Sequence, residues 1–174
     1  MKRWITLLPL GALLLALALF GLFALGRNTR IEPNAMVDKP APELMAPLLE
    51  GGPPLALSTQ IQGPALVNLF ASWCPPCAAE SPYLMGLKAQ GVRIVGVAQK
   101  DKPAATAQFL TRWGDPFAVV LNDAKGRATI DFGATGLPET FVVDSKGMIV
   151  GKHTGPLENQ EQVDALLAKL AAAR

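Results

Sequence analysis

The chain contains only two cysteines, Cys74 and Cys77, and they stand three positions apart between an apolar run and a helix-like segment. The run at 65–70 has a single polar interruption, Asn68, which is typical of a buried strand. Residues 78–88 have the composition of a helix. The sequence therefore predicts a strand that turns through the cysteine motif into a helix, with Cys74 at the helix N-terminus.

That position has chemical consequences for the first cysteine. The unpaired amides and the positive end of the dipole at a helix N-terminus favour a thiolate over a thiol. We therefore predict that Cys74 attacks the substrate, and that Cys77, one turn later and turned inward, resolves the mixed disulfide. Pro75 and Pro76 fix φ in the first turn, where a missing N–H costs least.

Three other interpretations of the cysteine pair stay open. A structural staple over so short a loop would contribute only about 2 kcal/mol in the chain-entropy model. A zinc site needs four ligands, and the chain has a single histidine, His153. A Cys-x-x-Cys without a role is possible in any chain, although the flanking strand and helix and the neighbouring Trp73 argue against it. We expect no metal and no dissociable cofactor, because the redox group would be the Cys74–Cys77 disulfide.

The rest of the pattern from residue 40 alternates short strand-like and longer helix-like segments. We predict strands at 93–98, 139–144 and 148–153, and helices at 102–113 and 158–173. Phe109 and Trp113, at helical spacing, are predicted to lie in the core. This order predicts an α/β domain with a mixed central sheet flanked by helices.

The N-terminal segment is the longest apolar stretch of the sequence. Residues 4–25 carry no charge, and 22 residues give roughly 33 Å of helix, enough to cross a bilayer core of about 30 Å. The alternative is a cleaved signal peptide, but Leu25-Gly26-Arg27 is a poor cleavage site. We predict one transmembrane anchor at 1–26, a linker at 27–39 and a globular domain at 40–174.

The charges give orientation and exclude one class of partner. Lys2 and Arg3 precede the apolar run, whereas Arg27 and Arg30 follow it, so the charge rule gives a slight bias to an N-terminus inside. From Ile31 onward, 12 Lys and Arg face 14 Asp and Glu, which leaves no basic footprint for nucleic acid. A catalytic dithiol is best suited to the oxidising periplasm. We predict a single-pass protein of the bacterial inner membrane with its C-terminal domain in the periplasm.

A second feature lies 60 residues after the cysteines. In Gly136-Leu137-Pro138-Glu139-Thr140-Phe141 a proline directly precedes a strand, and X-Pro bonds adopt the cis form at modest cost. The alternative is an ordinary trans proline in a turn. Beside a Cys-x-x-Cys motif we favour a cis bond.

At these two places the sequence resembles the thioredoxin superfamily, and more narrowly the CcmG/DsbE-type thiol:disulfide interchange proteins of cytochrome c biogenesis. The related TlpA and ResA-like proteins share much of the same pattern. The resemblance covers nearly the whole chain, including the anchor, 39–42, 68–80, 91–101 and 136–144. It implies a thioredoxin-like fold.

The resemblance also implies roles for individual residues. Pro138 would be cis and lie against the cysteine pair, leaving the Leu137 backbone free to bind an extended substrate by strand addition. Trp73, Pro75 and Pro76 join Leu137 as candidate substrate-binding residues.

Two acidic residues are implied as catalytic neighbours of the dithiol. Glu80 and Glu139 would give the site an acidic character, raise the pKa of Cys74 and shuttle protons. The alternative for each is a solvated surface residue. Thioredoxin itself has a buried acid where this chain has Asn68, which cannot accept the proton of Cys77, so Glu80 is the candidate to do so.

The function implied is a membrane-anchored periplasmic thiol:disulfide oxidoreductase that reduces apocytochrome c, or its partner thiol protein, during cytochrome c maturation. A membrane electron donor of the DsbD/CcdA type would recharge it. Because the motif has no histidine and has acids nearby, we predict a reductant. The alternatives are a general periplasmic TlpA/ResA-like disulfide reductase and a non-catalytic chaperone of apocytochrome or haem.

Overall fold

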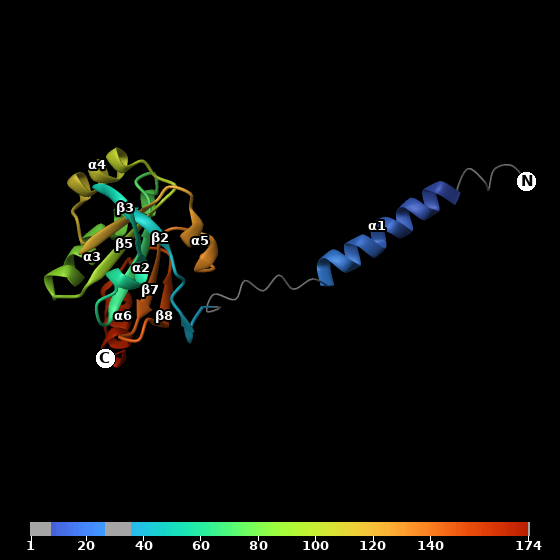
Figure 1. The fold of residues 1–174 in the computed structure, drawn as a ribbon. Helices are drawn as coiled ribbons and strands as arrows, with labels where there is room; N and C mark the ends of the chain where they lie inside the picture. The colour runs from blue at the N-terminus through green and yellow to red at the C-terminus, as the bar shows by residue number, and fades with distance from the viewer. Residues whose placement is uncertain (1–7, 27–35, 174) are drawn as a thin grey trace, which may run out of the picture. The chain divides into compact units, whose positions relative to one another are not determined.

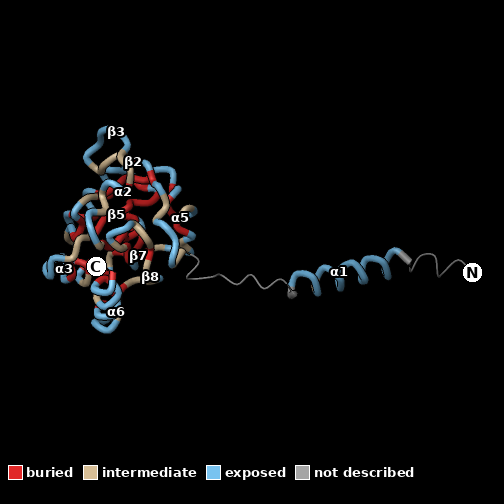
Figure 2. The backbone as a smooth tube through the Cα atoms, turned by 60° about the horizontal axis from the view of Figure 1, so that its bottom comes forward, coloured by how far each residue is buried: buried red, intermediate tan, exposed pale blue. Residues whose placement is uncertain are grey.

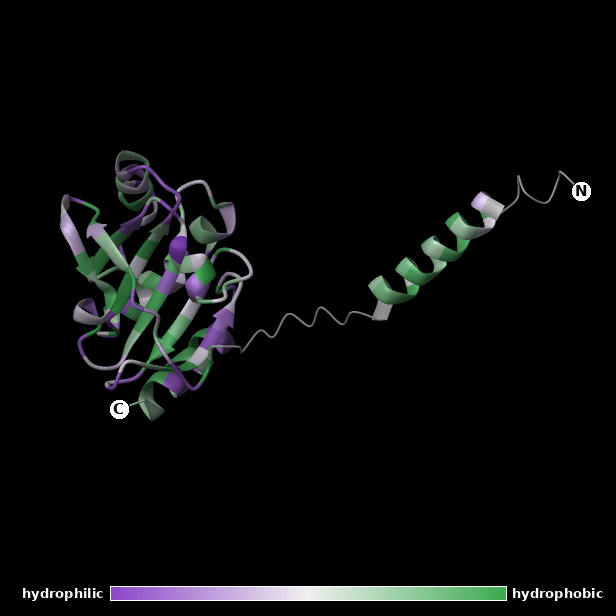
Figure 3. Ribbon diagram, turned by 45° about the vertical axis from the view of Figure 1, so that its right-hand side comes forward, coloured by the Kyte–Doolittle hydropathy of each residue, from purple (hydrophilic) through white to green (hydrophobic). Residues whose placement is uncertain are grey.

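The computed structural model describes residues 8–26 and 36–173, and the chain divides into two units, Met1–Glu32 and Pro33–Arg174 (Figure 1). In the first unit, α1 (Leu8–Gly26) is an apolar helix along its described length (Figure 3). No helix among the described residues is long and apolar enough to cross a membrane. Much of the predicted linker, 27–35, and the start of the predicted anchor, 1–7, lie outside the described residues.

The second unit is built on one mixed sheet with the strand order β1-β8-β7-β4-β5-β6-β2-β3. The central strand β4 runs parallel to β5 and antiparallel to β7, and β5 runs parallel to β6. This confirms the predicted mixed sheet. The strands are β1 (Lys39–Pro40), β2 (Met45–Leu48), β3 (Gly51–Ala56), β4 (Ala65–Phe70), β5 (Ile94–Gln99), β6 (Val119–Asp123), β7 (Glu139–Val143) and β8 (Met148–Thr154).

Helices cover both faces of the sheet (Figure 1). The core on one face takes side chains from α3, α4 and α6, and the core on the other takes side chains from α2 and α5. The helices are α2 (Leu57–Gln60), α3 (Pro75–Ala89), α4 (Pro103–Trp113), α5 (Arg127–Asp131) and α6 (Gln160–Ala172). The fold is thioredoxin-like, as expected.

Strand β4 is buried along its whole length and lies between β7 and β5 in the sheet, and the buried segments around β5 and β7 lie in the interior of the second unit (Figure 2). Its side chains alternate between the two cores, so both faces must be apolar and the strand is an almost continuous apolar run. On the α3 side, the ring of Phe70 stacks on Phe117 with 4.6 Å between centroids and lies 5.9 Å from Phe109. This packing holds the end of β4, from which the cysteine loop begins.

The prediction that Trp113 lies in the core is wrong. Phe109 is buried, but Trp113 is 44% exposed at the last turn of α4. Its ring lies 5.0 Å from the guanidinium carbon of Arg112, an arrangement that stabilises an aromatic side chain at the surface. Helical spacing identified the buried side of α4 at Phe109, but the last buried residue of the helix is Leu110, three positions before Trp113.

Candidate active site

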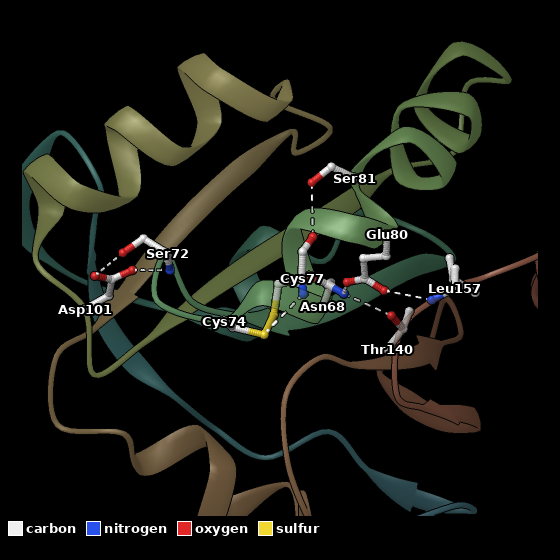
Figure 4. The surroundings of a disulfide bond; sticks show 9 residues. All are labelled: Asn68, Ser72, Cys74, Cys77, Glu80, Ser81, Asp101, Thr140 and Leu157. Atoms are coloured by element: carbon white, nitrogen blue, oxygen red, sulfur yellow. Dashed lines mark hydrogen bonds between the residues drawn. A yellow bond between two sulfur atoms is a disulfide. The ribbon is translucent and has the colours of Figure 1, made fainter.

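The two cysteines join the end of a strand to the start of a helix. Cys74 is the N-cap of α3, and the backbone N–H of Cys77 donates to its Sγ at 3.2 Å. The two sulfurs form a disulfide (Figure 4). Pro75 and Pro76 occupy the first two helical positions, where no N–H is needed for the helix. The predicted placement of Cys74 at a helix N-terminus is confirmed.

The surface around the disulfide carries two depressions that meet at Cys74. The first has a volume of about 430 Å³ and brings together Cys74 and all four predicted substrate-binding residues, Trp73, Pro75, Pro76 and Leu137. The exposed side chain of Ile130, on α5, also lines this depression. An apolar groove beside a reactive sulfur can bind the chain that flanks a partner's cysteine.

The second depression, of about 470 Å³, shares Trp73 and Cys74 with the first and is also lined by Ala78, Phe109 and Trp113. Both cysteines are buried, but Cys74 lines both depressions, whereas Cys77 lines neither. A partner would therefore meet Cys74 first. The order of attack itself stays a prediction.

The proline loop faces the same groove. The Leu137–Pro138 peptide bond is cis, as expected, and the buried Pro138 accepts a hydrogen bond at its carbonyl from Gly155 N at 3.0 Å. Within the part of the chain that the structure describes, the backbone N–H and C=O of Leu137 make no hydrogen bond to protein. Both groups are available to an extended polypeptide in the groove.

Glu80 lies one helical turn after Cys77 and is fully buried. Its Oε1 accepts from Asn68 Nδ2 at 2.9 Å, and its Oε2 accepts from Leu157 N at 3.2 Å (Figure 4). The same Asn68 amide nitrogen also donates to Thr140 Oγ1 at 3.0 Å. The side chain at position 68 therefore supports the acid of α3 instead of supplying one.

Burial raises the pKa of Glu80 to about 7 from 4.5, while the hydrogen bonds from Asn68 and Leu157 lower it by less. A carboxyl group with a pKa near neutrality is suited to accept and release protons. The surface alternative for Glu80 does not apply, because the residue is in the interior. Its part in proton transfer stays a prediction.

Glu139 is also buried, but it makes different contacts. Its Oε1 accepts from Thr135 N at 2.9 Å and Thr135 Oγ1 at 2.8 Å, and its Oε2 lies 2.8 Å from Lys152 Nζ. Along β7, Thr140 faces Asn68, so the adjacent Glu139 points to the opposite face of the sheet from Glu80. The carboxylate is paired with a cation and holds the loop before Pro138, and its predicted effect on the dithiol remains a prediction.

Thr140 and Lys152 were not among the predicted site residues. Thr140 carries a sequence signal, because it is a polar residue that directly precedes the apolar run 141–143 of a buried strand. Lys152 carries no such signal, because it is out of phase with the buried positions Ile149 and Gly151 of β8. Within the described residues, no cluster of three or more His, Cys, Asp and Glu is placed to hold a metal ion, and the expectation of a metal-free site stays untested.

The arrangement is suited to dithiol–disulfide exchange. One sulfur at a helix N-terminus lines a surface groove, it is bonded to a second sulfur that does not line the groove, and a buried acid lies one helical turn after that second cysteine. Fold and site together define the class of protein, a thiol-disulfide oxidoreductase with a thioredoxin-like fold.

The model of the Redoxin family matches residues 36–168, and the thiol:disulfide interchange protein DsbE of Allochromatium vinosum is 40% identical over 168 residues, covering 94% of this chain and 92% of that protein. The chain therefore belongs to the Redoxin family, and within it to the DsbE-type thiol:disulfide interchange proteins.

Two further similarities agree. The thiol:disulfide interchange protein DsbE of Escherichia coli K12 is 39% identical over 165 residues, covering 90% of this chain and 88% of the relative. The crystal structure of a secreted Mycobacterium tuberculosis disulfide oxidoreductase homologous to E. coli DsbE is 26% identical, with a TM-score of 0.62 over 75% of this chain and 96% of that one.

Proposed function

We propose that this protein is a membrane-anchored periplasmic reductant, which reduces the disulfides of apocytochrome c, or of its partner thiol protein, during cytochrome c maturation. The observation that carries the proposal is the groove that is lined both by Cys74 and by Leu137, whose backbone N–H and C=O are unpaired. Main-chain pairing in such a groove binds an extended segment without demanding a strict sequence. This suits unfolded clients that share a cysteine motif.

The reaction is a two-electron exchange. The Cys74 thiolate of the reduced protein attacks one sulfur of the client disulfide, so that a mixed disulfide forms and the first client thiolate leaves. Cys77 loses its proton and attacks Cys74 Sγ. The second client thiolate then leaves, the client is a dithiol, and this protein is the Cys74–Cys77 disulfide. A membrane dithiol donor of the DsbD/CcdA type would reduce that disulfide again.

Glu80 is the proposed acceptor of the Cys77 proton. It is buried one turn after Cys77, and its pKa of about 7 leaves it partly ionised at neutral pH. As an anion it disfavours a second negative charge nearby, so it supports a poorly stabilised thiolate and a reducing protein. The motif also lacks the histidine that could stabilise the thiolate.

The membrane anchor is part of the proposal. The uncharged run at 4–25 supports it, although 4–7 lie outside the described residues. The described part of α1 is apolar on all sides, which is typical of a helix that is buried in a protein core or in a membrane. Inner-membrane localisation with a periplasmic domain follows from the slight charge bias and from the cysteine pair.

The test uses the full chain in detergent and an oxidised peptide with a Cys-x-x-Cys-His segment. We expect the reduced protein to reduce this peptide, the Cys74→Ala variant to be inactive, and the reduction potential to lie below about −150 mV. A higher potential contradicts the proposed direction. A Cys74→Ala variant that still supports cytochrome c maturation in cells would instead favour a binding chaperone.

The client is identified by trapping. Cys77→Ala leaves the mixed disulfide unresolved, so the attached protein can be isolated and named. Apocytochrome c or a thiol protein of its maturation supports the proposal, whereas a broad mixture of unrelated periplasmic proteins favours the general TlpA/ResA-like reductase.

A further inference from the structure

The loop that carries Cys74 is tied to a neighbouring loop by one buried carboxylate. Asp101 follows β5, and its Oδ2 accepts from Ser72 N at 2.6 Å, while its Oδ1 accepts from Ser72 Oγ at 2.8 Å (Figure 4). The same Oδ1 accepts from Lys102 N at 2.8 Å, at the start of α4. Asp101 is 8% exposed and makes no salt bridge within the described residues, so these hydrogen bonds alone compensate its charge.

A second contact joins the same two loops. The indole Nε1 of Trp73 donates to the carbonyl of Lys100 at 3.3 Å. Lys100 has φ of 47°, a left-handed conformation that is uncommon outside glycine, and its N–H donates to the Asp123 carbonyl of β6 at 3.0 Å. The loop after β5 is therefore itself fixed, and it can hold the residues before Cys74 in place.

We propose that Asp101 is a positioning residue for disulfide exchange, because its carboxylate clamps Ser72 and thereby holds Trp73 and the Cys74 sulfur at the N-terminus of α3. The inference rests on the proposed function and adds to it a residue that touches neither sulfur. When the disulfide is reduced, the covalent ring that holds Cys74 opens, and the carboxylate clamp remains to fix the loop.

The clamp predicts the direction of the effect. A carboxylate that acted only through its charge would disfavour the thiolate, so its removal would speed exchange and lower the pKa of Cys74. A clamp acts the other way, because a loosened loop lets the sulfur leave the helix N-terminus and its hydrogen bond from Cys77 N. Removal then slows exchange and raises the pKa of Cys74.

The experiment compares Asp101→Ala, Asp101→Asn, Ser72→Ala and the Ser72→Ala/Asp101→Ala double variant in the full chain. The control is Asp144→Ala. Asp144 is likewise a carboxylate that accepts from two loop amides, Lys146 N and Met148 N at 2.8 Å each, but it lies in the β7–β8 turn. The readouts are the thermal stability of the oxidised protein, the rate at which the reduced protein reduces an oxidised Cys-x-x-Cys-His peptide, and the titration of the Cys74 thiolate.

We expect both Asp101 variants to lose about tenfold in the rate of exchange per folded molecule, since small misplacements of a reacting atom are costly. The double variant should be no slower than Asp101→Ala, because Ser72 acts through the same carboxylate. Asp144→Ala should lower the thermal stability but leave the rate of exchange and the titration of Cys74 unchanged. Variants that lose stability but keep the wild-type rate and Cys74 titration, or that become faster, would overturn the inference.

The two proposals can fail separately. A wild-type chain that reduces no peptide contradicts the proposed function. In that case the titration still decides on the clamp, and identical Cys74 titration curves for the wild type and Asp101→Asn would overturn it.

Discussion

The carboxyl group of Glu80 is buried, and its pKa of about 7 lies above the ordinary 4.5, which makes the stability of the domain depend on pH. Below about pH 4.5 the group is protonated in both the folded and the unfolded chain. Between 4.5 and 7 the folded chain keeps a proton that the unfolded chain loses, so stability falls as pH rises. Above about pH 7 the loss is complete, and it amounts to about 3 kcal/mol.

Glu80→Gln removes this titration while keeping the size of the side chain. We expect the free energy of unfolding of the oxidised wild type, measured relative to this variant by urea titration, to fall by about 3 kcal/mol between pH 4.5 and 8. Parallel curves for the two proteins would show that Glu80 has an ordinary pKa.

Glu139 and Lys152 form an ion pair in which the side chains are 0% and 4% exposed. Removing one partner leaves an uncompensated buried charge, so Glu139→Gln and Lys152→Met should each cost about 3–5 kcal/mol in urea unfolding. The double variant should recover much of that loss. The exposed pair Arg127 and Asp131 serves as the control, and Asp131→Asn should cost less than about 1 kcal/mol. If the double variant instead lost the sum of the two single losses in unfolding free energy, Glu139 and Lys152 would not interact as an ion pair.

At the scale of elements, β5 depends on a glycine. A Cβ on Gly96 would lie 2.8–3.0 Å from ring atoms of Phe117, and that ring cannot retreat easily because it stacks on Phe70. Gly96→Ala should therefore destabilise the domain by about 1–3 kcal/mol in urea unfolding, since overpacking forces strand or ring to shift. An unchanged midpoint would mean that the ring moves freely.

Gly86→Ala is the matched substitution in a helix. Gly86 is in the interior of α3 and exposed, and a Cβ there meets nothing within 4 Å. Alanine should stabilise the domain by about 0.5–1 kcal/mol, because glycine loses more conformational freedom in a helix. If Gly96→Ala and Gly86→Ala changed the stability in the same direction, the predicted clash of residue 96 with Phe117 would be contradicted.

The elements that the sequence predicted are those with a strong local pattern. An unbroken apolar run identified β4, and 3.6-residue spacing identified α6. Strands β2 and β3 were not predicted, because Met45–Leu48 and Gly51–Ala56 contain prolines and glycines and form strands by pairing with each other and with β6. Helix α5 is too short for any periodicity.

The same distinction holds in the site. The cysteine motif and the proline loop are local signals, and their placement was predictable. The contacts of Asp101 with Ser72 and of Glu139 with Lys152 join loops or strands that meet only because the sheet brings them together. The spacing of residues in the sequence does not show to which face of the sheet such a side chain points. The burial of Glu80 and the ion pair of Glu139 could therefore be seen only in the structure.

At the scale of the whole molecule, the proposal requires that the apolar N-terminal segment hold the chain in the inner membrane. In cell fractionation we expect the full chain in the membrane pellet after an alkaline wash, because 22 uncharged residues span roughly 33 Å. Leu14→Arg/Leu17→Arg should release it, since each arginine near the centre of the run costs about 2.5–3.5 kcal/mol.

Asn28→Arg/Thr29→Arg is the control for added charge, because it places the same two residues outside the uncharged run, where they should leave the chain in the pellet. The side of the membrane is tested independently, by fusing the C-terminus of the wild type to a reporter that is active only in the periplasm and, in a second fusion, to one that is active only in the cytoplasm. We expect activity from the first fusion alone. Activity from the cytoplasmic fusion alone would place the dithiol in a reducing compartment, where its proposed clients would not need it. A wild-type chain absent from the pellet would contradict the proposed membrane anchor, but it would not affect the proposed disulfide exchange by Cys74 and Cys77.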